Sequence, residues 1–151
     1  MAQTETGMEL TEEIIEHMMH PKNYGKLDSP SGVGVGYDEQ SGEYVIMYLA
    51  TEGEHVDNIA YATNGCQDTV ILGSVFTEMV KGTTIDDARE TAAMLEGKLA
   101  AAPAKQQACS ELVLSAFAAA LVNRGHRNEG SDQEFHKIKI GRTCDSGEGT
   151  E

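Results

Sequence analysis

The sequence predicts an α+β fold in which a three-stranded antiparallel sheet packs against helices. Residues 33–63 form three short segments rich in strand formers, with apolar positions at every second residue. After residue 65 the apolar residues instead recur with the 3.6-residue period of a helix. Because three strands alone are only marginally stable in water, helices must cover one face of the sheet.

The first predicted element is a helix that starts near Leu10. Leu10, Ile14 and Met18 are spaced four residues apart, which places them on one helix face. Acidic residues occupy its first turn, where the helix dipole favours negative charge. Pro21 should end the helix within about a residue of His20, because the residue before a proline is disfavoured in helical conformation.

The predicted strands are residues 33–37, 44–49 and 56–63. A tight connection at residues 51–54 separates the last two. Successive strands that are joined by short turns pair as antiparallel neighbours. We therefore expect a meander.

Three further helices are predicted after the sheet. The first runs from about Gln67 to Lys81, and the second from the N-cap Thr84 to about Met94. The third closes near Gly125. Its apolar positions are Leu112, Leu114, Phe117, Ala118, Leu121 and Val122.

These elements predict one domain at residues 10–124, preceded by a loose segment at residues 1–9. The chain of 151 residues fits one domain, since domains usually contain about 100–200 residues. Residues 125–151 are expected to form a flexible acidic tail. Within this tail, Phe135, Ile138 and Ile140 would form either a short strand or a docking segment.

Acidic residues dominate the charge of the chain. It contains 11 Lys and Arg against 25 Asp and Glu, a formal net charge of −14. Nucleic acids and anionic membranes require a basic face, so we expect neither as a partner. The sequence has no run of about 20 apolar residues for a membrane helix and no signal-peptide pattern at its start. We therefore expect a cytoplasmic protein.

The three cysteines are the main candidates for chemistry. Cys66 and Cys109 lie at the predicted starts of two helices, where the helix dipole stabilises thiolate, and they would converge at one end of a small domain. The alternative is that both are buried core residues, as free cysteines usually are. Cys144 lies in the tail and is either an additional reactive thiol or an exposed one without a role.

Other motifs of enzymes and metal sites are weak. There is no C-x-x-C pair, and G-V-G-V-G at residues 32–36 lacks the dinucleotide-binding spacing. Ser41 and Ser110 have no G-x-S-x-G context. His17 and His20 would form either a metal-binding pair or polar groups at a helix end. We expect a protein that is not an enzyme.

Several motifs in series resemble the iron–sulfur cluster scaffolds of the IscU/NifU type. They occur in the order and spacing of that family and cover about residues 10–124. The motifs are E-H-M-M-H-P-K-N-Y-G at 16–25, G-V-G-V-G at 32–36, N-G-C at 64–66, K-G-T-T-I-D-D-A at 81–88, and K-Q-Q-A-C-S-E-L at 105–112.

This resemblance implies a [2Fe–2S] cluster assembled on three cysteines and an aspartate, with sulfur from a cysteine desulfurase and delivery to iron–sulfur client proteins. Cys66 and Cys109 match the second and third cysteines. Ser41 stands where the first cysteine is expected, Glu43 where the aspartate is, and Ala108 where a histidine precedes the third cysteine. The family's chaperone-recognition segment reads A-A-P-A-K at residues 101–105, which suggests that its usual chaperone is not used.

These departures leave the metal and the function open. Serine is a poor ligand for iron, whereas Cys66, Cys109 and Glu43 would hold iron or zinc with one open position. The first hypothesis is a scaffold or carrier that binds iron, a [2Fe–2S] cluster or sulfur transiently. The alternative is a non-assembling adaptor or structural subunit of a larger iron–sulfur or redox complex. A third is a sulfur relay through Cys66, Cys109 or Cys144.

Overall fold

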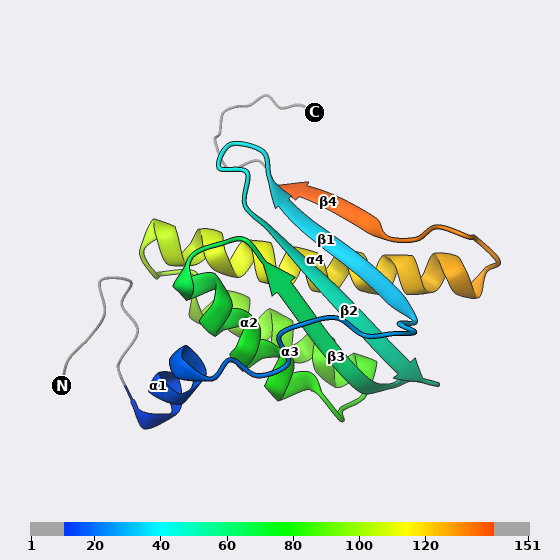
Figure 1. The fold of residues 1–151 in the computed structure, drawn as a ribbon, viewed down its shortest axis with the longest axis horizontal. Helices are drawn as coiled ribbons and strands as arrows, with labels where there is room; N and C mark the ends of the chain where they lie inside the picture. The colour runs from blue at the N-terminus through cyan, green and yellow to red at the C-terminus, as the bar shows by residue number, and fades with distance from the viewer. Residues whose placement is uncertain (1–10, 141–151) are drawn as a thin grey trace.

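The computed structural model describes residues 11–140, which form one sheet with helices α2, α3 and α4 beside it (Figure 1). The sheet has the strand order β3-β2-β1-β4. The elements are α1 (Glu12–Met19), β1 (Gly32–Asp38), β2 (Tyr44–Glu52), β3 (His55–Thr63), α2 (Gln67–Val80), α3 (Ile85–Lys98), α4 (Ala104–Asn128) and β4 (His136–Ile140).

The α+β class and the antiparallel meander β1-β2-β3 are confirmed. In β1, Gly32 pairs with Leu49 and Tyr37 with Tyr44, and β3 continues the antiparallel pairing on the other side of β2. Thr11 and Thr84 cap α1 and α3 by accepting hydrogen bonds from backbone N–H groups in the first turns. Helices α3 and α4 are longer than the periodicity predicts: α3 continues to Lys98, and α4 starts at Ala104 and continues to Asn128.

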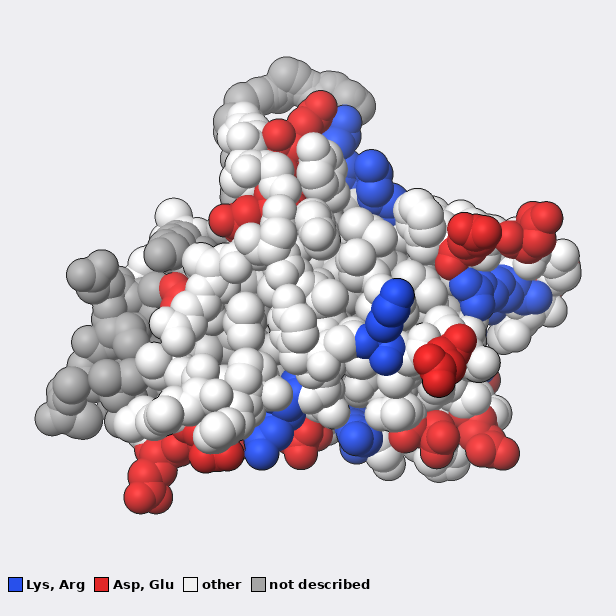
Figure 2. Space-filling view, viewed as in Figure 1, with Lys and Arg blue, Asp and Glu red and all other residues white. Residues whose placement is uncertain are grey.

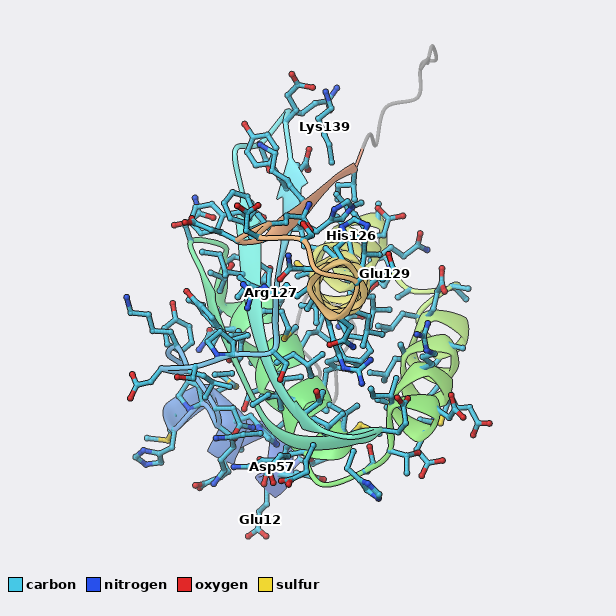
Figure 3. The ribbon with its side chains drawn as sticks, turned by 90° about the vertical axis from the view of Figure 1, so that its right-hand side faces the viewer. Glu12, Asp57, His126, Arg127, Glu129 and Lys139 are labelled. Atoms are coloured by element: carbon cyan, nitrogen blue, oxygen red, sulfur yellow. The ribbon has the colours of Figure 1, made fainter. Side chains whose placement is uncertain are left out.

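The sheet has one strand more than the three predicted, and of the two options for residues 135–140 the short strand is confirmed. Strand β4, from the segment assigned to the tail, pairs in parallel with β1 and makes the sheet four-stranded and mixed. Arg127 holds the connection in place, because its guanidinium donates to the carbonyl oxygens of Pro30, Gln133 and Glu134. Ile138 and Ile140 then cover part of α4. Figure 3 shows this end of the molecule, with α4 viewed almost along its axis.

Three glycines of β1 bring the strand into backbone contact with α4. A Cβ atom on Gly36 would lie 2.6 Å from the carbonyl oxygen of Leu112, and one on Gly34 would collide with the backbone of Ala116 and Ala120. Such distances are shorter than any van der Waals contact. The absence of side chains at Gly32, Gly34 and Gly36 is therefore what allows α4 to pack this closely.

The core lies between the sheet and the helices. Val45, Met47 and Leu49 of β2 alternate toward it and are completely buried. Phe76 of α2 meets Phe117 of α4 edge to face, with ring centroids 5.0 Å apart. The two helices are thus fixed to each other as well as to the sheet.

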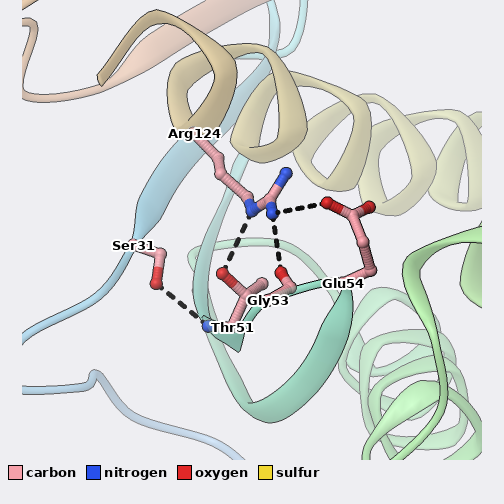
Figure 4. Close-up of polar contacts among 5 residues, drawn as sticks. All are labelled: Ser31, Thr51, Gly53, Glu54 and Arg124. Carbon is pink, nitrogen blue, oxygen red and sulfur yellow. Dashed lines mark hydrogen bonds and ion pairs between the residues drawn. The ribbon is translucent and has the colours of Figure 1, made fainter. Parts of the chain in front are cut away.

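Arg124 ties the far end of α4 to the β2–β3 hairpin (Figure 4). Its Nε donates to the Thr51 hydroxyl at 3.0 Å, and its Nη2 donates to the Gly53 carbonyl at 2.8 Å. An ion pair with Glu54 at 3.3 Å completes the contact. Helix α4 is therefore anchored along the whole sheet.

Helix α1 is held to α2 by a buried histidine. His17 is 5% exposed, and its Nδ1 lies 2.5 Å from the Ser74 hydroxyl, which also accepts a hydrogen bond from the Lys22 backbone N–H. His20 is exposed at the end of α1. This arrangement favours the interpretation of the two histidines as structural and helix-end groups.

Between residues 11 and 140, no helix has both the length and the apolar character needed to cross a membrane.

Replacing Gly34 with alanine tests the backbone contact. Gly34→Ala should lower the free energy of unfolding by about 3 kcal/mol, because the methyl group has no space against α4. The measurement is denaturant unfolding followed by circular dichroism. Gly97→Ala is the matched control: its Cβ would meet nothing within 4 Å, and the change should stabilise α3 by up to about 1 kcal/mol. Equal stability of the two variants would contradict the close packing.

Candidate functional site

The structure brings Cys66 and Cys109 together, as the sequence predicts. Their Sγ atoms are 3.8 Å apart. Cys66 is half-buried and forms the N-cap of α2, whereas Cys109 is 3% exposed. The expected position of Cys109 at a helix start needs correction: α4 begins at Ala104, so Cys109 lies in its second turn and faces the core.

The end of β3 positions Cys66. The Thr63 hydroxyl donates to the Tyr44 carbonyl at 2.6 Å and accepts from the Gly65 N–H at 2.9 Å. Tyr24 donates its hydroxyl to the Thr63 carbonyl at 2.9 Å. The carbonyl of Cys66 then accepts hydrogen bonds from the N–H groups of Thr69 and Val70, and these are the first hydrogen bonds of α2. Cys66 therefore lies on a short connection that is fixed on both sides.

Backbone and side-chain donors of α2 surround the Cys66 sulfur. Burial by itself would raise the pKa of this thiol. The backbone N–H groups of Thr69 and Asp68 outweigh burial, and the side chains of Cys109 and Thr69 add to their effect, so the pKa lies below its ordinary value. This is the environment of a thiolate at a helix N-terminus.

Burial has the opposite outcome for Cys109. Burial, opposed by a hydrogen bond from Thr69 and assisted by the neighbouring Cys66, raises the pKa of that thiol to about 11. The two thiols therefore differ in acidity. Cys66 ionises at a lower pH than Cys109 and is the more readily activated nucleophile of the pair.

Ser41 and Glu43 lie in the turn between β1 and β2. Ser41 is exposed, and its hydroxyl accepts a hydrogen bond from the Glu43 N–H at 3.2 Å. Asn64 joins this turn to the Cys66 connection: its Nδ2 donates to the Gly42 carbonyl at 3.2 Å, and its Oδ1 accepts from the Tyr44 N–H at 2.8 Å. The turn and the thiol pair thus belong to the same end of the sheet.

The structure does not gather the full predicted ligand set. Among residues 11–140, no group of three His, Cys, Asp or Glu side chains lies close enough to hold a metal ion. The thiol pair is formed, and Glu43 stands apart from it in the neighbouring turn. Ala108, directly before Cys109 in α4, offers no ligand atom, and Cys144 lies outside the described residues.

Sequence reasoning missed Asn64 and Thr69. Thr69 is completely buried, and its hydroxyl lies 3.9 Å from the Cys66 sulfur. A threonine three residues after a cysteine at a helix start is a recognisable signal, since that spacing returns the side chain to the N-cap. An asparagine directly after a strand is a similar signal for a side chain that bridges two turns.

The chemistry available here is that of two adjacent thiols. A thiolate with a second thiol beside it can bind a soft metal ion, react with a sulfur electrophile, or do both at different times.

Comparison with known proteins gives one consistent result. Residues 9–130 match the family described as the NifU-like N terminal domain. Two proteins of Archaeoglobus fulgidus, named iron–sulfur cluster assembly scaffold proteins IscU 1 and IscU 2, are each 27% identical over 91% of this chain and 96% of their own length. A Rickettsia prowazekii protein named scaffold protein IscU is 28% identical over 81% of this chain and 96% of its own length.

Solved structures show the same fold. One is a putative iron–sulfur cluster assembly scaffold protein for the SUF system from Fervidobacterium islandicum. It has a TM-score of 0.65 and 19% identity, and the match covers 74% of this chain and 95% of that one. The N-terminal part of a NifU-like protein from Brucella abortus has a TM-score of 0.60 and 20% identity, with coverage of 80% and 95%.

The difference between the two thiols can be measured by alkylation. We expect iodoacetamide to modify Cys66 first, with a rate that rises at a pH below that of an ordinary thiol. Cys109 should stay unmodified until the pH approaches about 11. Intact mass and peptide mapping on the full chain carrying Cys144→Ser provide the measurement.

Thr69→Val should move the rate profile of Cys66 to higher pH, because the hydroxyl that stabilises the thiolate is removed. Thr69→Ser keeps the hydroxyl and is the matched control. Equal rates at the two cysteines would contradict the described environments.

Proposed function

The chain belongs to the family of NifU-like N-terminal domains, and from this premise we propose that it is a scaffold or carrier in iron–sulfur cluster assembly. It would hold iron, a [2Fe–2S] cluster or sulfur transiently and pass it on to client proteins, without catalysing turnover. The observation that carries this proposal is the contact of Cys66 and Cys109 at 3.8 Å, at the N-terminus of α2. The names of the IscU relatives support the same role.

The donor set fits a transiently held cargo. Two thiolates are ligands that iron, iron–sulfur clusters and zinc all accept. Glu43 would add a carboxylate oxygen from the adjacent turn, and Ser41 offers a hydroxyl where a third thiolate would bind more firmly. Fewer strong ligands favour release, so the site suits delivery better than storage. Zinc in place of iron remains part of this proposal.

The partners follow from this function. A cysteine desulfurase would supply sulfur, and iron–sulfur proteins would receive the product. The sheet offers a surface for such contacts: the face seen in Figure 2 carries few charges over the strands. A hollow of about 260 Å³ on this face is lined by Val35, Tyr37, Tyr44, Ile46, Phe135 and Lys137. We propose a protein partner on this face and a cytoplasmic location for the complex.

A second function is favoured by the same residues. Ser41 stands in the β1–β2 turn with only a hydroxyl to offer, and no group of three ligands forms within residues 11–140. A non-assembling adaptor or structural subunit of an iron–sulfur or redox complex would need the sheet surface and not the thiols.

Anaerobic reconstitution with ferrous iron and sulfide separates the two functions. A scaffold should develop sulfide-to-iron charge-transfer absorption with bound iron, and Cys66→Ala should lose both. Glu90→Ala is the control, because it changes an exposed side chain of α3 outside the site and should load like the parent chain. A colourless protein that purifies with a stoichiometric partner would instead support the adaptor.

Ser41→Cys should strengthen the site. The change adds a third thiolate on the turn that Asn64 joins to Cys66. We expect iron to leave the loaded variant about 10-fold more slowly when a chelator is added, within the range of changes in metal affinity that altered metal-site residues produce. Unchanged chelation kinetics would show that the turn does not reach the cargo.

A further inference from the structure

The two sulfurs of the site differ in their access to solvent. Cys66 is half-buried, on the connection between β3 and α2. Cys109 is 3% exposed and packs in the hydrophobic core. A molecule arriving from solvent can therefore meet Cys66 more readily than the buried Cys109, whose sulfur is in contact with that of Cys66.

Sulfur delivered to a thiol and sulfur built into a cluster differ by two electrons. A persulfide carries its terminal sulfur at the oxidation level of elemental sulfur, whereas the bridging atoms of an iron–sulfur cluster are sulfide. Some group must supply two electrons between delivery and assembly. Two thiols that become a disulfide supply this number.

We propose that Cys66 and Cys109 act together as a sulfide-releasing pair: Cys66 accepts a sulfur atom from a persulfide, and Cys109 then displaces that atom as hydrogen sulfide. This inference rests on the proposed function, and it adds a reductive step to the binding of cargo at the same site.

The two steps balance in atoms and electrons. First, the Cys66 thiolate attacks the terminal sulfur of a persulfide R–S–SH. The donor's S–S bond breaks, the thiolate R–S⁻ leaves, and Cys66 carries the persulfide. Second, the Cys109 sulfur attacks Sγ of Cys66. The new Cys66–Cys109 bond forms, and the terminal sulfur leaves as HS⁻ while Cys109 loses its proton. The pair is oxidised by two electrons and the sulfur atom is reduced by two.

The geometry selects this second step. The atom of Cys66 in contact with Cys109 is Sγ itself, at 3.8 Å, which becomes the inner atom of the persulfide. A disulfide bond is about 2.05 Å long, so the sulfurs need to approach by less than about 2 Å. The terminal sulfur, added to the half-buried side, is then the leaving group.

The cycle is stoichiometric unless a dithiol reductant reopens the disulfide. Each reduced chain therefore releases one sulfide. During that turnover the same two sulfurs are not available as metal ligands, so sulfide release and cargo binding must alternate.

The test uses the full chain carrying Cys144→Ser, fully reduced and anaerobic, with glutathione persulfide as the donor. We expect one equivalent of sulfide above a protein-free blank. Intact mass should fall by two hydrogen atoms, and peptide mapping should show residues 66 and 109 joined. Cys109→Ala should instead gain one sulfur atom at Cys66 and release no sulfide above the blank. Cys66→Ala should remain unmodified.

Cys109 is buried, so Cys109→Ser accompanies Cys109→Ala, and circular dichroism verifies that both fold. The mass of the Cys144→Ser chain is decisive even if neither variant folds. A persulfide that persists on Cys66 while Cys109 stays reduced would overturn the proposal. Equal sulfide release by Cys109→Ala would do the same, as would a chain that the donor leaves unmodified.

The outcome is separable from that of the proposed function. Reconstitution with ferrous iron and preformed sulfide needs no persulfide. A chain that loads iron but releases no sulfide keeps the scaffold function and loses this inference. A chain that releases sulfide but never loads iron does the reverse.

Discussion

The backbone contact between β1 and α4 sets the position of the whole site. Gly32, Gly34 and Gly36 give α4 a path along the strand that any side chain would block. Because α4 lies at this depth, its second turn places Cys109 in the core, directly beneath the connection that carries Cys66. Three glycines on one strand therefore fix the depth at which α4 packs, and α4 carries one of the two sulfurs of the site. The remaining core contacts, including that of Phe76 with Phe117, are consistent with this position of α4.

The unlike character of the two thiols arises from their places in the helices. Cys66 stands before α2, where the backbone N–H groups of Asp68 and Thr69 in the first turn lie against its sulfur and lower the pKa of its thiol. Cys109 stands inside α4, where every such group is already engaged and the surroundings are apolar. The sulfur contact therefore joins Cys66, whose surroundings stabilise the thiolate, to Cys109, whose surroundings stabilise the neutral thiol. Such a pairing suits ordered chemistry, in which one sulfur reacts and the other responds.

Most of the architecture could be predicted from local patterns, because period and turn residues act over a few positions. The strands, the start of α2 at Gln67 and the convergence of Cys66 with Cys109 were all accessible in this way. Strand β4 was only one of two options for its segment, because its five residues carry a short alternation. Its pairing with β1 was not predicted, because that strand lies about a hundred residues earlier. Asn64 was missed because its partners Gly42 and Tyr44 become its neighbours only after folding. Thr69 was missed although its three-residue spacing from Cys66 is a local signal. The metal ligands remain a prediction.

Strand β4 protects the edge of β1 from pairing with other chains. It is the last of the described elements to leave the ribosome, and until it docks, the free side of β1 offers unpaired N–H and C=O groups to other chains. Once in place, β4 presents Lys137 and Lys139 outward, the latter paired with Glu39 at 3.2 Å. Charged side chains of this kind discourage further strand addition. The segment thus closes the free edge of β1 when it docks, and its lysines protect the new edge from strand addition.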